Sequence, residues 1–196
     1  MAFPLGRPAR LAVVASGRGT NLAALIAAFP PGGDEAEVAL VVSEKASAPA
    51  LERARGAGVE AAHLPWDTRE AFEERLHGLL AARGVDLVCL AGFMRVLSPA
   101  FVDRWHGRLL NVHPSLLPKH RGLHAQRQAL EEGVRESGCS VHFVDAGVDT
   151  GKVIVQRRVP VLPGDDEEAL AARIRTEEHV AYPEAVRLVL RGEVTP

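Results

Sequence analysis

Short runs of β-branched and aliphatic residues alternate along the chain with helical patterns, and this alternation restricts the fold more than any other feature. Such runs fall at residues 10–16, 37–43, 59–65, 85–91 and 109–113. Strands that alternate with helices form an open sheet of parallel strands with helices on both faces. The sequence therefore predicts an α/β fold with one doubly wound, mostly parallel, Rossmann-like sheet.

The remaining elements are predicted from periodicity and capping signals. Helices are expected at residues 22–29, 46–57, 68–82, 98–105, 125–132 and 174–191, the last interrupted near Pro183. Further strands are expected at 140–144 and 153–161. The chain shows no internal repeat, low-complexity segment or linker. We therefore expect a single domain over residues 1–196.

Composition limits the classes of partner. The chain has 196 residues, of which 47% are hydrophobic and 24% charged, and a formal net charge of -2. This charge argues against a general nucleic-acid binder. Cys89 and Cys139 lie far apart without metal-ligand spacing, and no apolar run is long enough to span a bilayer. We expect a cytoplasmic protein that acts on small molecules, with no nucleic-acid or membrane partner and no signal peptide.

Asn111 and His113 stand two residues apart at the end of an apolar run, which suggests acid–base chemistry. In a strand their side chains point to the same face, and Pro114 prevents further ladder pairing. An amide can hold an oxyanion while an imidazole handles a proton, as a reaction at a carbonyl requires. The alternative is a structural turn. The chain contains only two asparagines, Asn21 and Asn111, which makes each more informative.

A glycine loop, Gly17 to Asn21, follows the first predicted strand and precedes a helix. Glycines let the backbone approach an anion, Thr20 or Asn21 can cap the helix, and its free N–H groups attract phosphate. The dinucleotide fingerprint would need a third glycine where this chain has Leu22, and the P-loop lysine is missing. We predict a mononucleotide or sugar-phosphate site; a plain tight turn is the alternative.

Three of these segments are expected to share one cleft. Residues 17–21, 92–95 and 111–118 all follow predicted strands, and ligands of open parallel sheets bind at the carboxyl ends of strands. The polar residues of the three segments should therefore belong to one site.

Four segments carry a closer resemblance. They are Ser16-Gly17-Arg18-Gly19-Thr20-Asn21, Leu90-Ala91-Gly92-Phe93-Met94-Arg95-Val96-Leu97-Ser98-Pro99, Asn111-Val112-His113-Pro114-Ser115-Leu116-Leu117-Pro118, and Ser140-Val141-His142-Phe143-Val144 with Asp149. Together they resemble the phosphoribosylglycinamide formyltransferase family of purine synthesis, over about residues 10–190. The resemblance implies transfer of a formyl group from 10-formyltetrahydrofolate, a co-substrate, to the amine of glycinamide ribonucleotide, with no metal. It also implies a phosphate-binding half at about 10–100 and a catalytic, folate-binding half at about 101–190.

The resemblance also implies individual roles. Asn111, His113 and Asp149 match the catalytic Asn, His and Asp of the family. Asn111 would bind the oxyanion of a tetrahedral intermediate with help from a protonated His113, and Asp149 would orient the imidazole and favour its charged form. The ribonucleotide would contact Gly17, Gly19, Thr20, Asn21 and Glu178. The folate would contact Arg69, Met94, Arg95, Val96, Leu97, Asn111, Asp145 and Asp149, with His142 and Ser115 as supporting residues. Taken singly, several of these positions are also explained by core packing or surface charge.

Three other functions fit parts of the pattern. Methionyl-tRNA formyltransferase is similar over residues 115–122, but it carries a carboxy-terminal domain and a basic tRNA surface that we do not expect here. Formyltetrahydrofolate hydrolase carries an amino-terminal domain, for which we expect no room. A non-catalytic nucleotide-binding module would explain the Gly17 loop but not the joint presence of Asn111, His113 and Asp149. We expect a monomer or weak homodimer.

Overall fold

The computed structural model describes residues 3–196, and strands and helices alternate along most of this length. In chain order the elements are β1 (Ala9–Val14), α1 (Thr20–Ala28), β2 (Ala36–Ser43), α2 (Pro49–Gly56), β3 (Glu60–His63), α3 (Arg69–Ala82), β4 (Leu87–Leu90), α4 (Pro99–Arg104), β5 (Leu109–His113), α5 (Ala125–Glu131), β6 (Glu136–Phe143), β7 (Val153–Pro160) and α6 (Glu167–Leu190). Each strand predicted from an apolar run is present.

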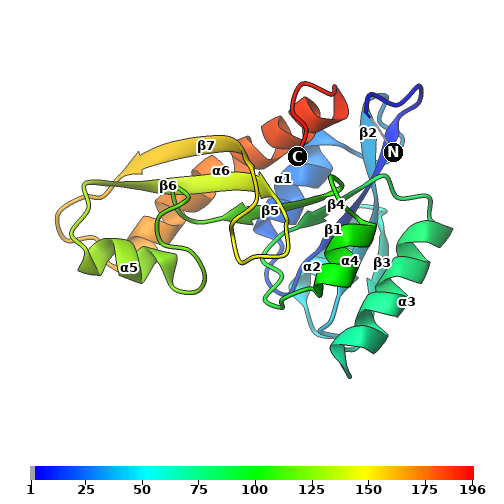
Figure 1. Cartoon of the computed structure of the whole chain (residues 1–196), viewed down its shortest axis with the longest axis horizontal. Helices are drawn as coiled ribbons and strands as arrows, with labels where there is room; N and C mark the ends of the chain where they lie inside the picture. The colour runs from blue at the N-terminus through cyan, green and yellow to red at the C-terminus, as the bar shows by residue number, and fades with distance from the viewer. Residues whose placement is uncertain (1–2) are drawn as a thin grey trace.

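All strands join one seven-stranded sheet in the order β3-β2-β1-β4-β5-β6-β7 (Figure 1). The first five strands in this order are parallel to one another. Strand β6 pairs antiparallel with β5, and β7 pairs antiparallel with β6. The chain adds β2 and β3 on one side of β1, then β4 and β5 on the other. This reversal opens a crevice at the carboxyl ends of β1 and β4, where doubly wound sheets bind ligands. The predicted fold class is confirmed.

Helices cover both faces of the sheet, which explains why the central strands are apolar on both sides. On β1, Leu11 and Val13 pack in a cluster with residues of α1, α2 and α6. Ala12 and Val14 point to the opposite face and pack with α3 and α4. Alternate side chains of one strand therefore belong to two separate cores.

Three expectations about helices and strands are corrected by the structure. Helix α6 runs without interruption from Glu167 to Leu190 and contains Pro183. Proline removes one backbone donor, but Pro183 is buried among core residues of α6, so tertiary contacts override the local penalty. Strand β6 begins at Glu136 rather than at residue 140, because its antiparallel pairing with β7 extends to Glu136↔Pro160. Strand β3 ends at His63, before the predicted end at residue 65.

The helix starts follow the capping signals in two cases and depart from them in one. Thr68 accepts the N–H of Ala71, and Ser98 accepts the N–H of Phe101, as N-cap residues do. Helix α1 has instead Gly19 as N-cap, with φ of 72° and no side-chain cap. The expectation that Thr20 or Asn21 caps this helix is wrong, because the left-handed turn at Gly19 starts the helix one residue earlier. Its first N–H groups lack a side-chain acceptor.

Strand β5 continues past the end of β4, and this places the site. The last pair between these strands is Leu90↔Asn111, so Val112 and His113 pair only with β6. One edge of β5 is therefore open beyond Asn111, beside the loop that follows β4. Within residues 3–196, no helix has the length and apolarity that crossing a bilayer requires.

Candidate active site

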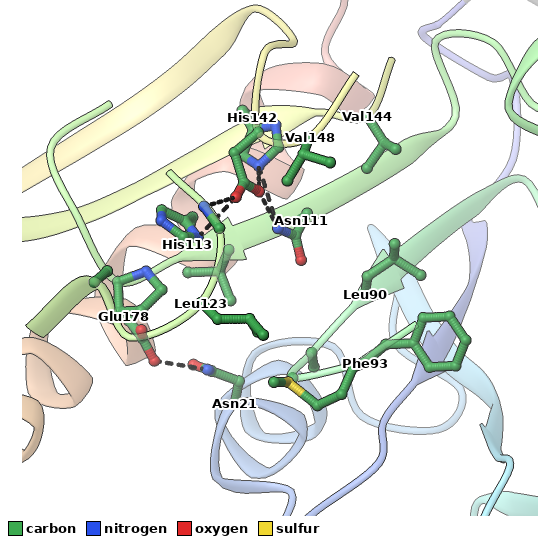
Figure 2. A pocket seen from close by; sticks show the side chains of 18 of the residues that line it. Asn21, Leu90, Phe93, Asn111, His113, Leu123, His142, Val144, Val148 and Glu178 are labelled. Carbon is green, nitrogen blue, oxygen red and sulfur yellow. Dashed lines mark hydrogen bonds and ion pairs between the residues drawn. The ribbon is translucent and has the colours of Figure 1, made fainter. Parts of the chain in front are cut away.

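A cavity of about 600 Å³ lies at the carboxyl ends of the parallel strands. Its walls are the loops after β1 and β4, the end of β5, residues 122–126, the loop between β6 and β7, and one face of α6. The three segments that the sequence predicted to share a cleft therefore do so. Figure 2 shows a central polar group, with the Asn21–Glu178 contact on one side and the apolar residues Leu90, Phe93 and Val144 on another.

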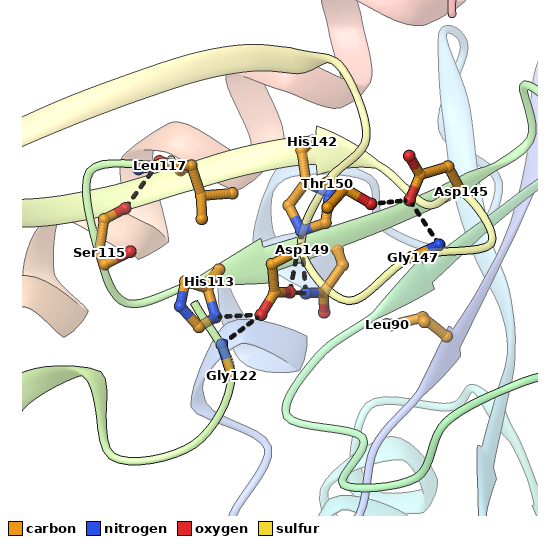
Figure 3. Close-up of polar contacts among 12 residues, drawn as sticks. Leu90, His113, Ser115, Leu117, Gly122, His142, Asp145, Gly147, Asp149 and Thr150 are labelled. Atoms are coloured by element: carbon orange, nitrogen blue, oxygen red, sulfur yellow. Dashed lines mark hydrogen bonds and ion pairs between the residues drawn. The ribbon is translucent and has the colours of Figure 1, made fainter. Parts of the chain in front are cut away.

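Asp149 is the centre of the polar group. Its Oδ2 lies 3.3 Å from Nδ1 of His113 and accepts the N–H of Gly122 at 2.9 Å. Its Oδ1 lies 3.5 Å from both Nδ2 of Asn111 and Nε2 of His142 (Figure 3). Burial acts to raise the pKa of Asp149, but the hydrogen bonds from His142 and Gly122 and the charge of His113 outweigh it. The pKa therefore lies below its ordinary value, and the carboxylate is ionised at neutral pH.

Both ring nitrogens of His113 face oxygen acceptors. Nε2 lies 2.8 Å from the carbonyl oxygen of His120, and Nδ1 faces Asp149. Only the imidazolium can donate to both. Burial lowers the pKa of His113 below its ordinary value, while the His120 carbonyl and Asp149 act to raise it. The charged ring thus depends on Asp149, and loss of this carboxylate would lower the pKa further.

The amide of Asn111 is oriented by its neighbour on β6. Nδ1 of His142 lies 2.8 Å from the carbonyl oxygen of Phe143 and donates to it. Nε2 of the same ring lies 3.2 Å from Nδ2 of Asn111 and 3.5 Å from Oδ1 of Asp149. Beyond the contact with His142, Nδ2 of Asn111 makes only the 3.5 Å contact with Asp149. Asn111 therefore keeps one weakly used donor at the cavity.

The loop after His113 is held by a buried hydroxyl network behind the cavity. Ser140 donates to the carbonyl oxygen of Ser115 at 2.7 Å and accepts the N–H of Leu117 at 3.0 Å. Ser115 in turn donates to the carbonyl oxygen of Lys119 at 2.6 Å. Gln156 on β7 donates to both Leu117 and Ser140. These bonds fix the chain as it leaves β5, and with it the direction of His113.

The other end of the cavity is polar and partly charged. Nδ2 of Asn21 donates to Oε2 of Glu178 at 2.8 Å, joining α1 to α6 (Figure 2). Burial raises the pKa of Glu178, and the Asn21 hydrogen bond offsets part of this effect. Arg175 lines the cavity on the preceding turn of α6. Arginine, amide and the uncapped start of α1 together form a surface suited to an anionic, hydrogen-bonding ligand.

Comparison with known proteins identifies the family of this chain. The sequence profile of the formyl transferase family matches residues 9–186. The chain therefore belongs to the formyl transferase family. The phosphoribosylglycinamide formyltransferase of Escherichia coli is 50% identical over 176 residues, which are 88% of this chain and 83% of that protein. The resemblance seen in the sequence motifs is confirmed.

Solved structures and longer relatives agree with this assignment. The crystal structure of glycinamide ribonucleotide transformylase 1 from Symbiobacterium toebii matches this formyl transferase with a TM-score of 0.92 at 51% identity, over 96% of this chain and 90% of that one. The trifunctional purine biosynthetic protein adenosine-3 of Drosophila melanogaster is 52% identical over 191 residues, 95% of this chain. The formyl transferase spans only 14% of the length of that insect protein.

Most of the residues predicted from the sequence line the cavity of this formyl transferase. These are Gly17, Gly19, Thr20, Asn21, Met94, Arg95, Val96, Leu97, Asn111, His113, His142, Asp145, Asp149 and Glu178. Ser115 is buried behind the cavity in the hydroxyl network. Arg69 does not line the cavity; it lies at the start of α3 with its side chain 46% exposed and its guanidinium 3.6 Å from Glu70.

Several lining residues were not foreseen. Arg175 stands three residues before Glu178, so helical spacing alone could have indicated it. Gly122, Leu123 and Val148 lie in loops, and no local pattern marks loop residues that meet only in the folded chain. Among residues 3–196, no group of three or more His, Cys, Asp or Glu side chains is placed to hold a metal ion.

Proposed function

We propose that this formyl transferase moves the formyl group of 10-formyltetrahydrofolate to the amine of glycinamide ribonucleotide, using Asn111, His113 and Asp149. The observation that carries the proposal is the Asp149 carboxylate, 12% exposed as a side chain, placed between His113 and Asn111 at the wall of the cavity. The names of its close relatives supply the identity of the two substrates.

The reaction begins with attack of the neutral amine on the formyl carbon, which gives a tetrahedral intermediate with an oxyanion. The weakly used N–H of Asn111 would bind this oxyanion, and the positive charge of the His113 imidazolium would stabilise it. One proton leaves the amine, and another must reach the departing nitrogen of the folate. Asp149 supports the charged ring and can accept the amine proton through water. The formyl carbon–nitrogen bond to the folate then breaks.

The two ends of the cavity suit the two substrates. The phosphate would bind at the first turn of α1, where the N–H groups of Thr20 and its neighbours have no side-chain cap. Glu178 and Asn21 would contact the glycinamide end. Exposed apolar side chains line the opposite part, among them Met94, Val96 and Val148, and offer surface for the flat pterin and aryl rings. Asp145 lies in the adjoining loop, where it accepts from Gly147 and Thr150.

We further propose a single domain that works in the cytoplasm as a monomer or weak homodimer. Both cysteines, Cys89 and Cys139, are free and buried, which suits a reducing compartment. We also propose that Arg69 contacts the folate, at a point outside the cavity. Ser115 and His142 act as supports of His113 and Asn111.

The test measures tetrahydrofolate release from 10-formyltetrahydrofolate with and without glycinamide ribonucleotide. Release that requires the acceptor and is lost in His113→Ala supports the transferase. Equal release without acceptor would mean a hydrolase and would overturn the proposal. Binding of both ligands without any release would instead indicate a binding module.

A further inference from the structure

Arg95 stands at the rim of the cavity with its guanidinium over the ring of Trp66. The distance from its Cζ to the ring centroid is 5.1 Å, within the range of a cation–π contact. Arg95 is exposed, and within the described residues it takes part in no ion pair with a carboxylate. Trp66 lies outside the cavity lining, between β3 and α3.

Trp66 is itself fixed by aromatic contacts. Its ring centroid lies 4.8 Å from that of Phe72 on α3 and 6.2 Å from that of Phe93. Phe72 and Phe93 stack on each other at 5.8 Å, and both are buried. Phe93 also faces the cavity (Figure 2). The indole is therefore a rigid platform anchored in the core.

The contact with Trp66 occupies one side of the guanidinium and uses none of its hydrogen-bonding capacity, because an aromatic ring face is not a carboxylate acceptor. The N–H donors that do not face the ring can therefore bind a carboxylate. An arginine held in this way loses less side-chain entropy when it binds an anion, because part of that entropy is already lost. Arg95 is therefore a preorganised carboxylate-binding group beside the apolar part of the cavity.

We propose that Trp66 is a positioning residue for the formyl donor, holding Arg95 ready for a carboxylate at the tail of the folate. This inference rests on the proposed function, in which a folate occupies the apolar part of the cavity. Met94 and Val96 flank Arg95 and are each 63% exposed, so ring-binding surface and cation adjoin in one loop. Trp66 itself touches no substrate and acts through Arg95.

The experiment compares Trp66→Leu and Trp66→Phe with the parent protein and uses two donors. One is 10-formyltetrahydrofolate; the other ends at the p-aminobenzoyl amide and has no carboxylate. Leucine keeps apolar bulk without a π face, and phenylalanine keeps a weaker one. We expect Trp66→Leu to raise KM for the full donor about two- to fivefold, with kcat nearly unchanged, and Trp66→Phe to lie between leucine and the parent. KM for the truncated donor should not change.

A double mutant separates positioning from general loosening of the loop. Arg95→Leu should raise KM for the full donor about tenfold, and adding Trp66→Leu in that background should have no further effect. A similar KM increase for both donors, an additive double mutant, or tighter binding in Trp66→Leu would each overturn the proposal. The Kd of tetrahydrofolate, measured by calorimetry without turnover, gives the same comparison even if formyl transfer to the ribonucleotide fails.

Discussion

Replacement of Asp149 by Asn tests the proposed chemistry most directly, because asparagine fits the site and lacks only the charge. Asp149 has a left-handed backbone with φ of 51°, which asparagine tolerates and alanine does not. The amide oxygen of asparagine can still accept the N–H of Gly122. The variant should therefore fold, with a melting temperature close to that of the parent protein.

The expected effect on turnover follows from the distance to His113. Unit charges 3.3 Å apart attract each other by about 5 kcal/mol at an effective dielectric constant of about 20. The two side chains are 7% and 12% exposed, so solvent screens this attraction little. If between half and all of it is used in the transition state, kcat falls about 10²- to 10⁴-fold. KM for both substrates should change far less, since asparagine keeps the size and shape of the Asp149 side chain in the cavity wall.

The assay is formyl transfer at saturating substrates, followed by kcat/KM over a range of pH. Asp149 raises the pKa of His113, so its loss lowers that pKa. If the imidazolium is the active form, activity declines as pH rises through the pKa of His113, and this decline moves to lower pH in the Asn variant. An unchanged kcat, a large rise in KM alone, or activity that instead increases as His113 loses its proton would refute the reasoning.

Three further outcomes are expected. Glu178→Gln should raise KM for the ribonucleotide about tenfold. Because burial raises the pKa of this acid, its ionisation costs stability as pH rises above its unfolded pKa, so the Gln variant should resist urea better than the parent at pH 7.5, with the difference shrinking at pH 5. Tyr182→Phe should lower the free energy of unfolding by about 1–2 kcal/mol, because the buried hydroxyl contacts the carbonyl oxygens of Leu90 and Leu110 at 2.9 and 3.0 Å; an unchanged urea midpoint would contradict this. Ser140→Ala leaves the buried N–H of Leu117 without its acceptor and should cost about 1–3 kcal/mol by the same assay, with kcat reduced more than KM increased.

Local signals in the sequence were sufficient for the strands, most helices and the pair on β5. Apolar runs flanked by glycine mark buried parallel strands, and period two places Asn111 and His113 on one face without any tertiary information. The glycine loop after β1 was likewise predicted from local sequence. The predictions that failed concern features that tertiary contacts decide. The continuation of α6 through Pro183 and the use of Gly19 as the N-cap of α1 both depend on tertiary packing, in the second case against Ala50.

Loop contacts were beyond any local pattern. The carbonyl oxygen of His120 reaches His113 because His120 itself has a left-handed backbone with φ of 51°. The N–H of Gly122 reaches Asp149 across 27 positions of the chain. Neither position carries a side-chain signal for these bonds, since both use backbone atoms. The family resemblance indicated Asp149 as a catalytic residue. Its hydrogen-bonding partners are seen only in the structure.

The register between β5 and β6 is what turns separate motifs into one site. Antiparallel pairing sets Asn111 opposite His142, and one residue of slip would move every side chain of β6 to the other face of the sheet. The connection between the two strands contains α5 and long loops, so the sequence cannot fix that register. In the structure Ser140, opposite His113, anchors it through hydrogen bonds to Ser115 and Leu117. The hydroxyl network behind the cavity therefore aligns the amide, imidazole and carboxylate groups in front of it.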